Sequence, residues 1–300
     1  MRFIVTFSVN DFRFNHPVNS IDNFSHLDQV EREVKYYRTI FISDTHLGTP
    51  GTQHDVLLDF LKHTHSDTLY LVGDIIDGWR LRKKWYWPQK HNDVVQKILR
   101  KARNGTKVIY IPGNHDEGAR QFVGNMFGEI SIKETDIHET ATGIKLWVVH
   151  GDLFDHVIKY ARWLAYLGDF AYSTLLVINK WLNKIRRLLK LPYWSLSQFL
   201  KHKVKLAVSF ISAFETVMIK ETKRRKCHGV VCGHIHKAEL KQIDDIIYAN
   251  SGDWVESLTA LVEHKDGSLA VLEWNTNNFE EIINQKMLSS ESIPPSQRVA

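Results

Sequence analysis

The stretch RTIFISDTHLG, residues 38–48, joins an apolar run to an aspartate and a histidine two positions apart. The run at 38–43 is rich in β-branched and aromatic residues, so it predicts a buried strand. Asp44 and His46 come directly after it, where neither side chain would help a strand to pack. A lone D-x-H of this kind is more often a turn or a helix cap, so its meaning depends on whether polar motifs also end other strands.

Apolar runs and helical patterns alternate through most of the chain. We expect strands at 38–43, 68–72, 107–111, 145–149, 229–232, 246–250, 258–264 and 269–274, and helices at 54–65 and 89–104. Strands that are continuous apolar runs are typical of a sheet whose two faces are both covered. The pattern therefore predicts a mixed α/β fold.

The chain has 300 residues, 16 of them histidine, and two cysteines, Cys227 and Cys232. Two cysteines are too few for a disulfide framework or a thiolate zinc site, which favours a reducing compartment. The N-terminal residues do not have the pattern of a secretory signal. The most apolar segment, 163–179, contains Asp169 and is shorter than a membrane span. We expect a cytoplasmic protein that can contact the inner face of the membrane.

Four segments of different character predict the domain organisation. Residues 1–36 are expected to form a weakly structured extension, 37–275 the main domain, and 276–300 a polar C-terminal tail. A helical insertion at 153–226 interrupts the main domain. The insertion holds 15 Lys and Arg against 4 Asp and Glu, a net charge of +11, whereas the whole chain has +5. The basic character of the protein therefore belongs to this insertion.

Five short polar motifs come directly after predicted strands. They are Asp44-Thr45-His46, Gly73-Asp74, Gly113-Asn114-His115-Asp116, His150-Gly151-Asp152 and Gly233-His234-Ile235-His236. Strand ends in α/β proteins meet at one edge, so these motifs can converge. Carboxylate, amide and imidazole donors together suit Mn²⁺, Fe or Zn²⁺. Any one motif could be structural, but all five at strand ends predict a metal site.

The order of these motifs resembles that of the calcineurin-like metallophosphoesterases. The resemblance covers roughly residues 38–275 outside the insertion, and it implies a four-layer αββα sandwich of two mixed β-sheets with a dimetal phosphoester site. Three features resemble the branch that contains UDP-2,3-diacylglucosamine diphosphatase. They are FISDTHLG at 41–48, the basic helical insertion, and SGDW at 251–254.

The resemblance also implies a role for each site residue. Asp44, His46 and His236 would bind one divalent ion, Asn114, His150 and His234 the other, and Asp74 would bridge the two ions. Mn²⁺ is the preferred ion, with Fe or Zn²⁺ as alternatives. His115 would contact the phosphate or protonate the leaving oxygen, and Asp116 would orient the His115 ring. No substrate-binding residue is predicted.

The substrate expected from the resemblance is a nucleotide-linked lipid, cleaved at a phosphoanhydride to UMP and a lipid phosphate. Members of that branch tend to have Arg where this chain has His115, and an arginine grips a diphosphate through two parallel hydrogen bonds. A phosphodiesterase or phosphatase acting on soluble nucleotides or nucleic acid is therefore the alternative enzyme. A non-catalytic scaffold with the same fold is the alternative of another class.

The insertion at 153–226 has three possible roles. It could be a helical hairpin with solvated charges, a lid that binds acyl chains beside anionic headgroups, or a nucleic-acid surface. Its long apolar stretches favour the lipid lid over nucleic acid. Peripheral membrane contact through this insertion is therefore expected.

Overall fold

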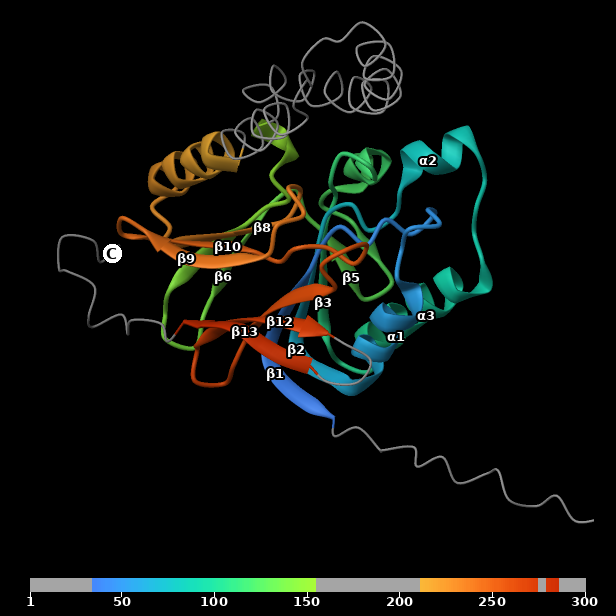
Figure 1. The fold of residues 1–300 in the computed structure, drawn as a ribbon, viewed down its shortest axis with the longest axis horizontal. Coiled ribbons are helices and arrows are strands. Elements are labelled where there is room, and N and C mark those ends of the chain that lie inside the picture. The colour runs from blue at the N-terminus through green and yellow to red at the C-terminus, as the bar shows by residue number, and fades with distance from the viewer. Residues whose placement is uncertain (1–33, 155–210, 275–278, 286–300) are drawn as a thin grey trace, which may run out of the picture. The chain divides into compact units, whose positions relative to one another are not determined.

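Two β-sheets packed face to face, with helices outside them, make up the part of the chain that the computed structural model describes (Figure 1). The described residues are 34–154 and 211–274, together with the backbone of 279–285. Most of the predicted extension, most of the helical insertion and the end of the predicted tail lie outside these residues. Within them, no helix is both long and apolar enough to cross a bilayer.

The larger sheet has eight strands. Their order is β13 (Phe279–Gln285), β12 (Leu269–Trp274), β11 (Thr259–Glu263), β1 (Lys35–Ile42), β2 (Thr64–Val72), β3 (Lys107–Ile111), β5 (Ile130–Ile132) and β4 (Met126–Phe127). Strands β1, β2 and β3 are parallel neighbours. The strand β11 pairs antiparallel with β1, which makes the sheet mixed.

The smaller sheet has five strands. Their order is β6 (Asp136–Glu139), β7 (Lys145–Val148), β8 (Gly229–Cys232), β10 (Ile246–Asn250) and β9 (Glu239–Ile243). Strands β7, β8 and β10 are parallel, and the two outer strands pair antiparallel with their neighbours.

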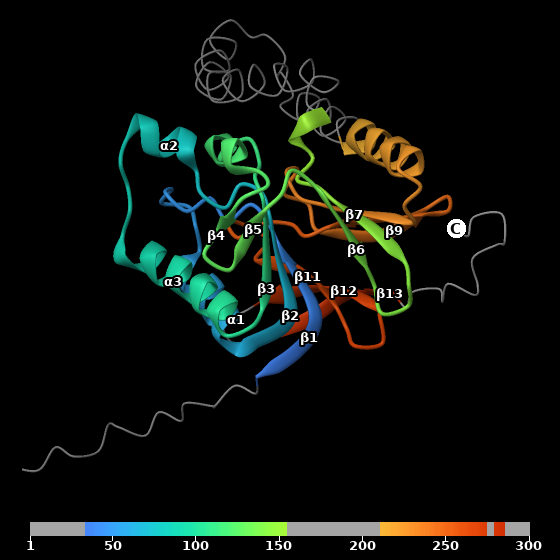
Figure 2. The same cartoon turned by 180° about the vertical axis from the view of Figure 1, so that it is seen from behind.

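Side-chain alternation along β1 explains how the layers form. Ile40 and Ile42 point outward to a core shared with α1 (His54–His63) and α3 (Gln89–Arg103). Phe41 points the other way, into the core between the two sheets. Helical residues 211–224 cover the outer face of the smaller sheet, where Phe214 packs in a cluster with Tyr248. Figures 1 and 2 show these helices on opposite sides of the sheets, so the predicted four-layer αββα architecture is confirmed.

Several short elements were not predicted from the sequence. They are α2 (Gly78–Lys83), the 3-10 turns η1 (Glu117–Phe122) and η2 (Asp152–Phe154), and strands β4, β5, β6, β9 and β13. The strand β13 corrects the expectation that residues 276–300 are only a tail, because 279–285 pair with β12. Its sequence, FEEIINQ, is mostly polar, but backbone pairing at a sheet edge needs no apolar run.

Candidate metal centre and active site

The five polar motifs all lie just beyond the carboxyl ends of strands that the two sheets bring together. Asp44, Asp74 and Asn114 come two or three residues after β1, β2 and β3 of the larger sheet. His150 and His234 come two residues after β7 and β8 of the smaller sheet. The site therefore lies where the strand ends of both sheets meet, and residues almost 200 positions apart in the chain become neighbours.

One candidate metal cluster contains Asp44, His46 and His236, which can each offer one ligand atom within 4.8 Å of the others. The Nε2 atom of His236 lies 3.2 Å from Oδ1 of Asp44 and 3.2 Å from Nε2 of His46. The Oδ1 atom of Asp44 is buried, and among the described residues its near neighbour is the His236 ring and no backbone N–H. Its other oxygen, Oδ2, accepts a hydrogen bond of 2.9 Å from the backbone N–H of His234. One oxygen is thus fixed by the protein while the other is left for a cation.

A second cluster contains Asp74, His150 and His234, again with ligand atoms within 4.8 Å of one another. The Nε2 atom of His150 lies 3.3 Å from Oδ2 of Asp74. Asn114 is also buried, and neither polar atom of its side chain has a hydrogen-bond partner among the residues that the structure describes. Unpaired buried polar atoms are rare, because each one loses its hydration without compensation. Several buried ligand atoms that lie close together at the strand ends are expected where side chains bind a cation.

The tautomer of His150 suits metal binding. Its Nδ1–H donates a hydrogen bond of 2.8 Å to the carbonyl of Val72, which leaves Nε2 facing Asp74. Burial acts to lower the pKa of His150, but the charge of Asp74 and its hydrogen bond outweigh burial and raise this pKa well above the ordinary value. A metal ion at Nε2 would replace this proton, and the negative charge of Asp74 that favours the proton would also favour the ion. The same backbone contact is typical of metal-binding histidines.

For Asp44 and Asp74 too, burial and the neighbouring histidines act on the pKa in opposite directions. Burial acts to raise the pKa of Asp74, but the charge of His150 and its hydrogen bond lower it below the ordinary range. For Asp44, burial is again the largest influence, and contact with His236 reverses it and lowers the pKa. Both carboxylates are therefore ionised at neutral pH.

Backbone strain is concentrated at the predicted ligands. The residues with positive φ include Asp44 (51°), His46 (47°), Asp74 (53°), His234 (71°) and His236 (53°). Non-glycine residues avoid this region, which costs about 1–3 kcal/mol for each residue. Backbone hydrogen bonds impose it here, among them His46 N–H to the carbonyl of Asp74 at 2.9 Å. The strained backbone at these residues turns their side chains toward the site.

The glycine at position 113 is required by the crowding of the site. A Cβ atom there would lie 2.3 Å from Oδ1 of Asp74 and 2.7 Å from its backbone nitrogen. Any side chain would therefore displace a predicted ligand. Only a glycine lets the loop after β3 approach Asp74 closely enough for the His115 N–H to donate a hydrogen bond to Oδ1, at 2.8 Å.

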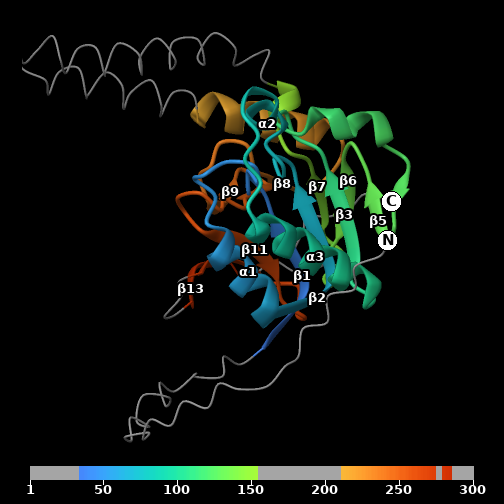
Figure 3. The ribbon, with the colours of Figure 1, turned by 90° about the vertical axis from the view of Figure 1, so that its right-hand side faces the viewer.

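Asp77 is a site residue that was not predicted from the sequence. Its Oδ1 atom lies 3.1 Å from Nδ1 of His115, and its Oδ2 atom lies 3.5 Å from Nδ1 of His46. The same carboxylate caps α2 by accepting a hydrogen bond of 2.8 Å from the N–H of Arg80. Burial acts to raise its pKa, but the contact with His115 lowers it below the ordinary range. Figure 3 shows α2 at the end of the molecule toward which β2 and β3 run.

The predicted role of Asp116 needs correction. Asp116 was expected to orient the His115 ring, but its carboxylate accepts hydrogen bonds from backbone N–H groups, including Gly113 and Ile75 at 2.5 and 2.8 Å. Its Oδ1 also accepts from the N–H of Asp74 at 3.3 Å. Burial raises the pKa of Asp116, and the charge of Asp74 adds to this effect. Asp116 therefore holds the loops after β2 and β3 together, and the carboxylate beside the His115 ring is that of Asp77.

Asp152, the last residue of the His150 motif, pairs with Arg120 of η1, whose Nη2 lies 2.6 Å from Oδ2. This ion pair holds Asp152 against η1, beside the predicted ligand His150. Trp79 of α2 also packs against the centre, with its ring centroid 4.4 Å from that of His115. His115 thus contacts both the Trp79 ring and the Asp77 carboxylate.

The family of the chain is shown by comparison with known proteins. Residues 37–238 match the family model of the calcineurin-like phosphoesterases. The chain belongs to this family of phosphoesterases.

Two relatives named UDP-2,3-diacylglucosamine hydrolase match parts of the chain. The protein from Chromohalobacter salexigens is 36% identical over 83 residues, which are 26% of this chain and 32% of that protein. The chain therefore spans about a third of that relative's length. The protein from Pectobacterium carotovorum is 21% identical over 221 residues, which are 69% of this chain and 85% of that protein.

Solved structures of similar shape include YfcE, a phosphoesterase from E. coli. It is 16% identical, with a TM-score of 0.43, and the match covers 82% of this chain and 97% of that one. Wild-type Vps29 from Entamoeba histolytica, complexed with zinc, is 14% identical with a TM-score of 0.39, and the match covers 81% and 95% of the two chains.

Proposed function

We propose that this protein hydrolyses a phosphoanhydride in a nucleotide-linked lipid such as UDP-2,3-diacylglucosamine, releasing UMP and a lipid phosphate. The observation that carries the hydrolytic centre is the convergence of buried ligand atoms from Asp44, Asn114 and His150 at the ends of two sheets, where the side chain of Asn114 has no hydrogen-bond partner among the described residues. The choice of substrate is supported by the two relatives that have this substrate in their names.

The donor set fits two divalent cations. Asp44, His46 and His236 would hold one cation, Asn114, His150 and His234 the other, and Asp74 would bridge them. When bound, two such cations supply charge that polarises a phosphoryl group and lowers the pKa of a nearby water. We propose Mn²⁺ as the resident ion, with Fe and Zn²⁺ as alternatives, because these donors are oxygen and imidazole nitrogen. The nearest cysteine in the chain, Cys232, is kept neutral because burial raises its pKa to about 12.

His115 would act on the leaving group. Asp77 lies beside its Nδ1 atom, so that nitrogen carries a proton and the ring orientation is fixed. Its Nε2 atom lies on the side of Asp74, at 4.0 Å from Oδ2. A proton on Nε2 can then pass to the departing oxygen of a phosphoester or phosphoanhydride. Asp116 would keep Asp74 in place by accepting a hydrogen bond from its backbone N–H.

A second candidate function is favoured by His115 itself. Members of the branch with the lipid substrate tend to have Arg at this position, and a histidine lacks the planar pair of donors that suits a diphosphate. A phosphodiesterase or phosphatase acting on soluble nucleotides or nucleic acid is therefore the alternative. A non-catalytic scaffold is disfavoured because every predicted ligand position is present in the sequence.

One experiment separates these functions. The full-length protein, supplied with Mn²⁺, is incubated with UDP-2,3-diacylglucosamine and with a panel of soluble nucleotides and oligonucleotides, and initial rates are compared. We expect the lipid to be turned over fastest, with UMP as a product. Turnover of soluble nucleotides alone would overturn the lipid substrate and leave the second function.

We also propose that residues 153–226 make peripheral contact with a membrane. Sedimentation of the protein with vesicles that contain or lack anionic lipid tests this contact.

A further inference from the structure

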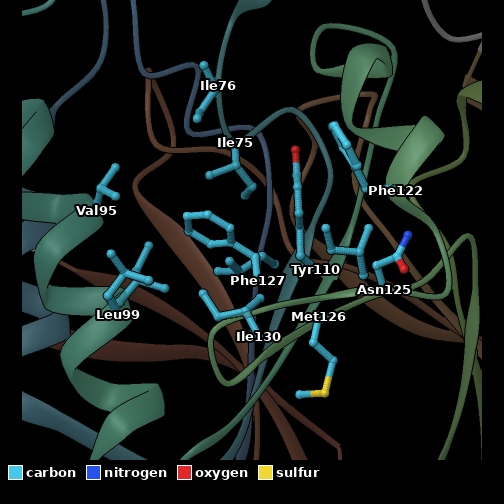
Figure 4. Close-up of a pocket in the computed structure, with 13 residues that line it drawn as sticks. Ile75, Ile76, Val95, Leu99, Tyr110, Phe122, Asn125, Met126, Phe127 and Ile130 are labelled. Carbon is cyan, nitrogen blue, oxygen red and sulfur yellow. The ribbon is translucent and has the colours of Figure 1, made fainter.

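We propose that an apolar cavity between α3 and the β4–β5 hairpin is a binding site for a hydrocarbon chain, and that it takes an acyl chain of the substrate. The cavity has a volume of about 400 Å³, within the range of small-molecule pockets. Figure 4 shows Val95 and Leu99 on α3 facing Phe127 and Ile130 of the hairpin. The role in the reaction rests on the function proposed above, whereas the chain-binding site itself does not.

The chemistry of the lining decides what the cavity can hold. Of the 13 described residues that line it, only Asn125 and Tyr110 have nitrogen or oxygen atoms in their side chains. Water in such a space would have few hydrogen-bond partners. A peptide would bring N–H and C=O groups that also need partners. A hydrocarbon chain needs none, so it is the ligand that this lining suits.

The rim of the cavity exposes large apolar side chains to solvent. Phe122 is 51% exposed, Met126 62% and Phe127 63%. Neighbouring exposed apolar residues at the mouth of an apolar cavity are a common sign of a binding surface. The strand β4 is an edge strand, but it contains only Met126 and Phe127 and is too short to pair with a long partner strand. The entrance therefore favours a small apolar ligand over an added strand.

The cavity shares a wall with the metal centre. Ile75 lines the cavity and comes directly after Asp74. Its carbonyl accepts hydrogen bonds from Thr45 Oγ1 at 2.7 Å and from Leu47 N–H at 2.9 Å, which lie on the loop of Asp44 and His46. Its N–H donates to Asp116. One residue, Ile75, thus contributes both to the lining of the apolar space and to the loops that hold the predicted metal ligands, so the cavity and the centre are neighbours.

Direct binding of a hydrocarbon probe tests the cavity without reference to catalysis. The probe is cis-parinaric acid, a fluorescent fatty acid, titrated into the full-length protein below its micelle concentration. Val95→Trp fills the cavity from α3, and Met126→Asp puts a charge at its exposed rim. Ile137→Trp on β6 is the matched control, since Ile137 is 55% exposed and does not line the cavity.

We expect saturable binding to the wild type and to Ile137→Trp. Binding should weaken at least about tenfold, the equivalent of roughly 1.4 kcal/mol, in Val95→Trp and Met126→Asp. All four proteins should have the same circular dichroism spectrum and a cooperative urea unfolding transition, which shows that the variants are folded. Absence of binding to the wild type, or equal binding by all four proteins, would overturn the cavity as a lipid site.

The role in the reaction is tested with UDP-diacylglucosamine of long and short acyl chains. The wild type should prefer the long chains, and Val95→Trp should lose that preference. If the probe binds as expected but UDP-diacylglucosamine is not hydrolysed, the proposed function fails while the binding site stands. If the lipid is hydrolysed with the same chain preference by Val95→Trp, the proposed function stands and this cavity is not the acyl site.

Discussion

The Oδ1 atom of Asp77 lies 3.1 Å from Nδ1 of His115, and this contact fixes the one histidine of the centre that is not a predicted metal ligand. Asp77 also caps α2, so the helix and the imidazole are positioned by the same carboxylate. The consequence is that a residue outside the five motifs controls the orientation of the predicted proton donor.

Asp77→Asn should reduce turnover roughly 10- to 100-fold, as is typical when a residue that orients an active-site histidine is changed. The loss should be larger with an alkyl phosphodiester than with bis-p-nitrophenyl phosphate, because nitrophenolate leaves without a proton. Steady-state rates on both substrates measure this difference. Asp55→Asn, on the exposed start of α1, is the control and should have normal rates. Equal rates for Asp77→Asn and wild type on both substrates would exclude the orienting role.

Asp74→Asn should remove nearly all activity while the fold remains intact. The variant keeps the oxygen that accepts the N–H of His115, but it loses the negative charge that faces His150. Metal content by mass spectrometry and circular dichroism after purification check the two parts of the prediction. A variant that retains both ions and near-normal turnover would contradict the bridging role of Asp74.

Gly113→Ala should inactivate the enzyme and reduce its free energy of unfolding by about 1–3 kcal/mol, as expected for overpacking. The added methyl group would meet Asp74 at 2.3 Å from Oδ1 and at 2.7 Å from its nitrogen. Gly118→Ala is the matched control, because the nearest atom to its Cβ would be Nη2 of Arg82, at 3.9 Å. Urea unfolding and rates on bis-p-nitrophenyl phosphate are the readouts. Equal unfolding free energies and equal rates for the two variants would mean that the loop after β3 can accommodate a side chain at position 113.

A buried ionic cluster far along β1 from the metal loops should make stability depend on acid pH. Glu263 is fully buried and lies 2.7 Å from both Arg38 Nη1 and His138 Nε2, which joins the two sheets. Burial acts to raise the pKa of Glu263, but the hydrogen bonds from His138 and from the N–H of Ala141 lower it below the ordinary value of 4.5. A carboxyl group whose pKa is lower in the folded state stabilises the fold above its unfolded pKa, and this contribution is lost as the pH falls through the folded value.

Urea unfolding of wild type and Glu263→Gln at pH 7 and at pH 4 tests this cluster. The variant should be less stable at pH 7 by about 3–5 kcal/mol, the usual effect of breaking a buried ion pair. The gap between the two proteins should narrow at pH 4. A gap that stays constant or widens toward pH 4 would show that the ionised form of Glu263 does not stabilise the fold.

The strands that carry the ligands could be predicted from the sequence because each is a buried, continuous apolar run. Strand β6 contains Asp136, His138 and Glu139, and its sequence lacks such a run. Asp77 was not predicted as a site residue for a different reason. It comes three residues after Asp74, in a place typical of a helix cap. Only the fold brings its second carboxylate oxygen close to His46. A second acid in GDIIDG was the available signal.

The apolar cavity had no signal in the sequence at all. Val95 and Leu99 have the spacing of core positions on α3, and Phe122 and Phe127 could have packed against them. Whether such residues close a core or leave a space depends on the distance between α3 and the hairpin, which no local pattern determines. The same limit applies to substrate choice, because the five motifs define the metal centre and not the lipid.

The most direct test of the dimetal centre is anomalous diffraction from crystals of the full-length protein grown with Mn²⁺. We expect two peaks close together, one among Asp44, His46 and His236 and one among Asn114, His150 and His234, with Asp74 between them. A single peak at another place, or no peak near these residues at saturating Mn²⁺, would contradict the dimetal centre.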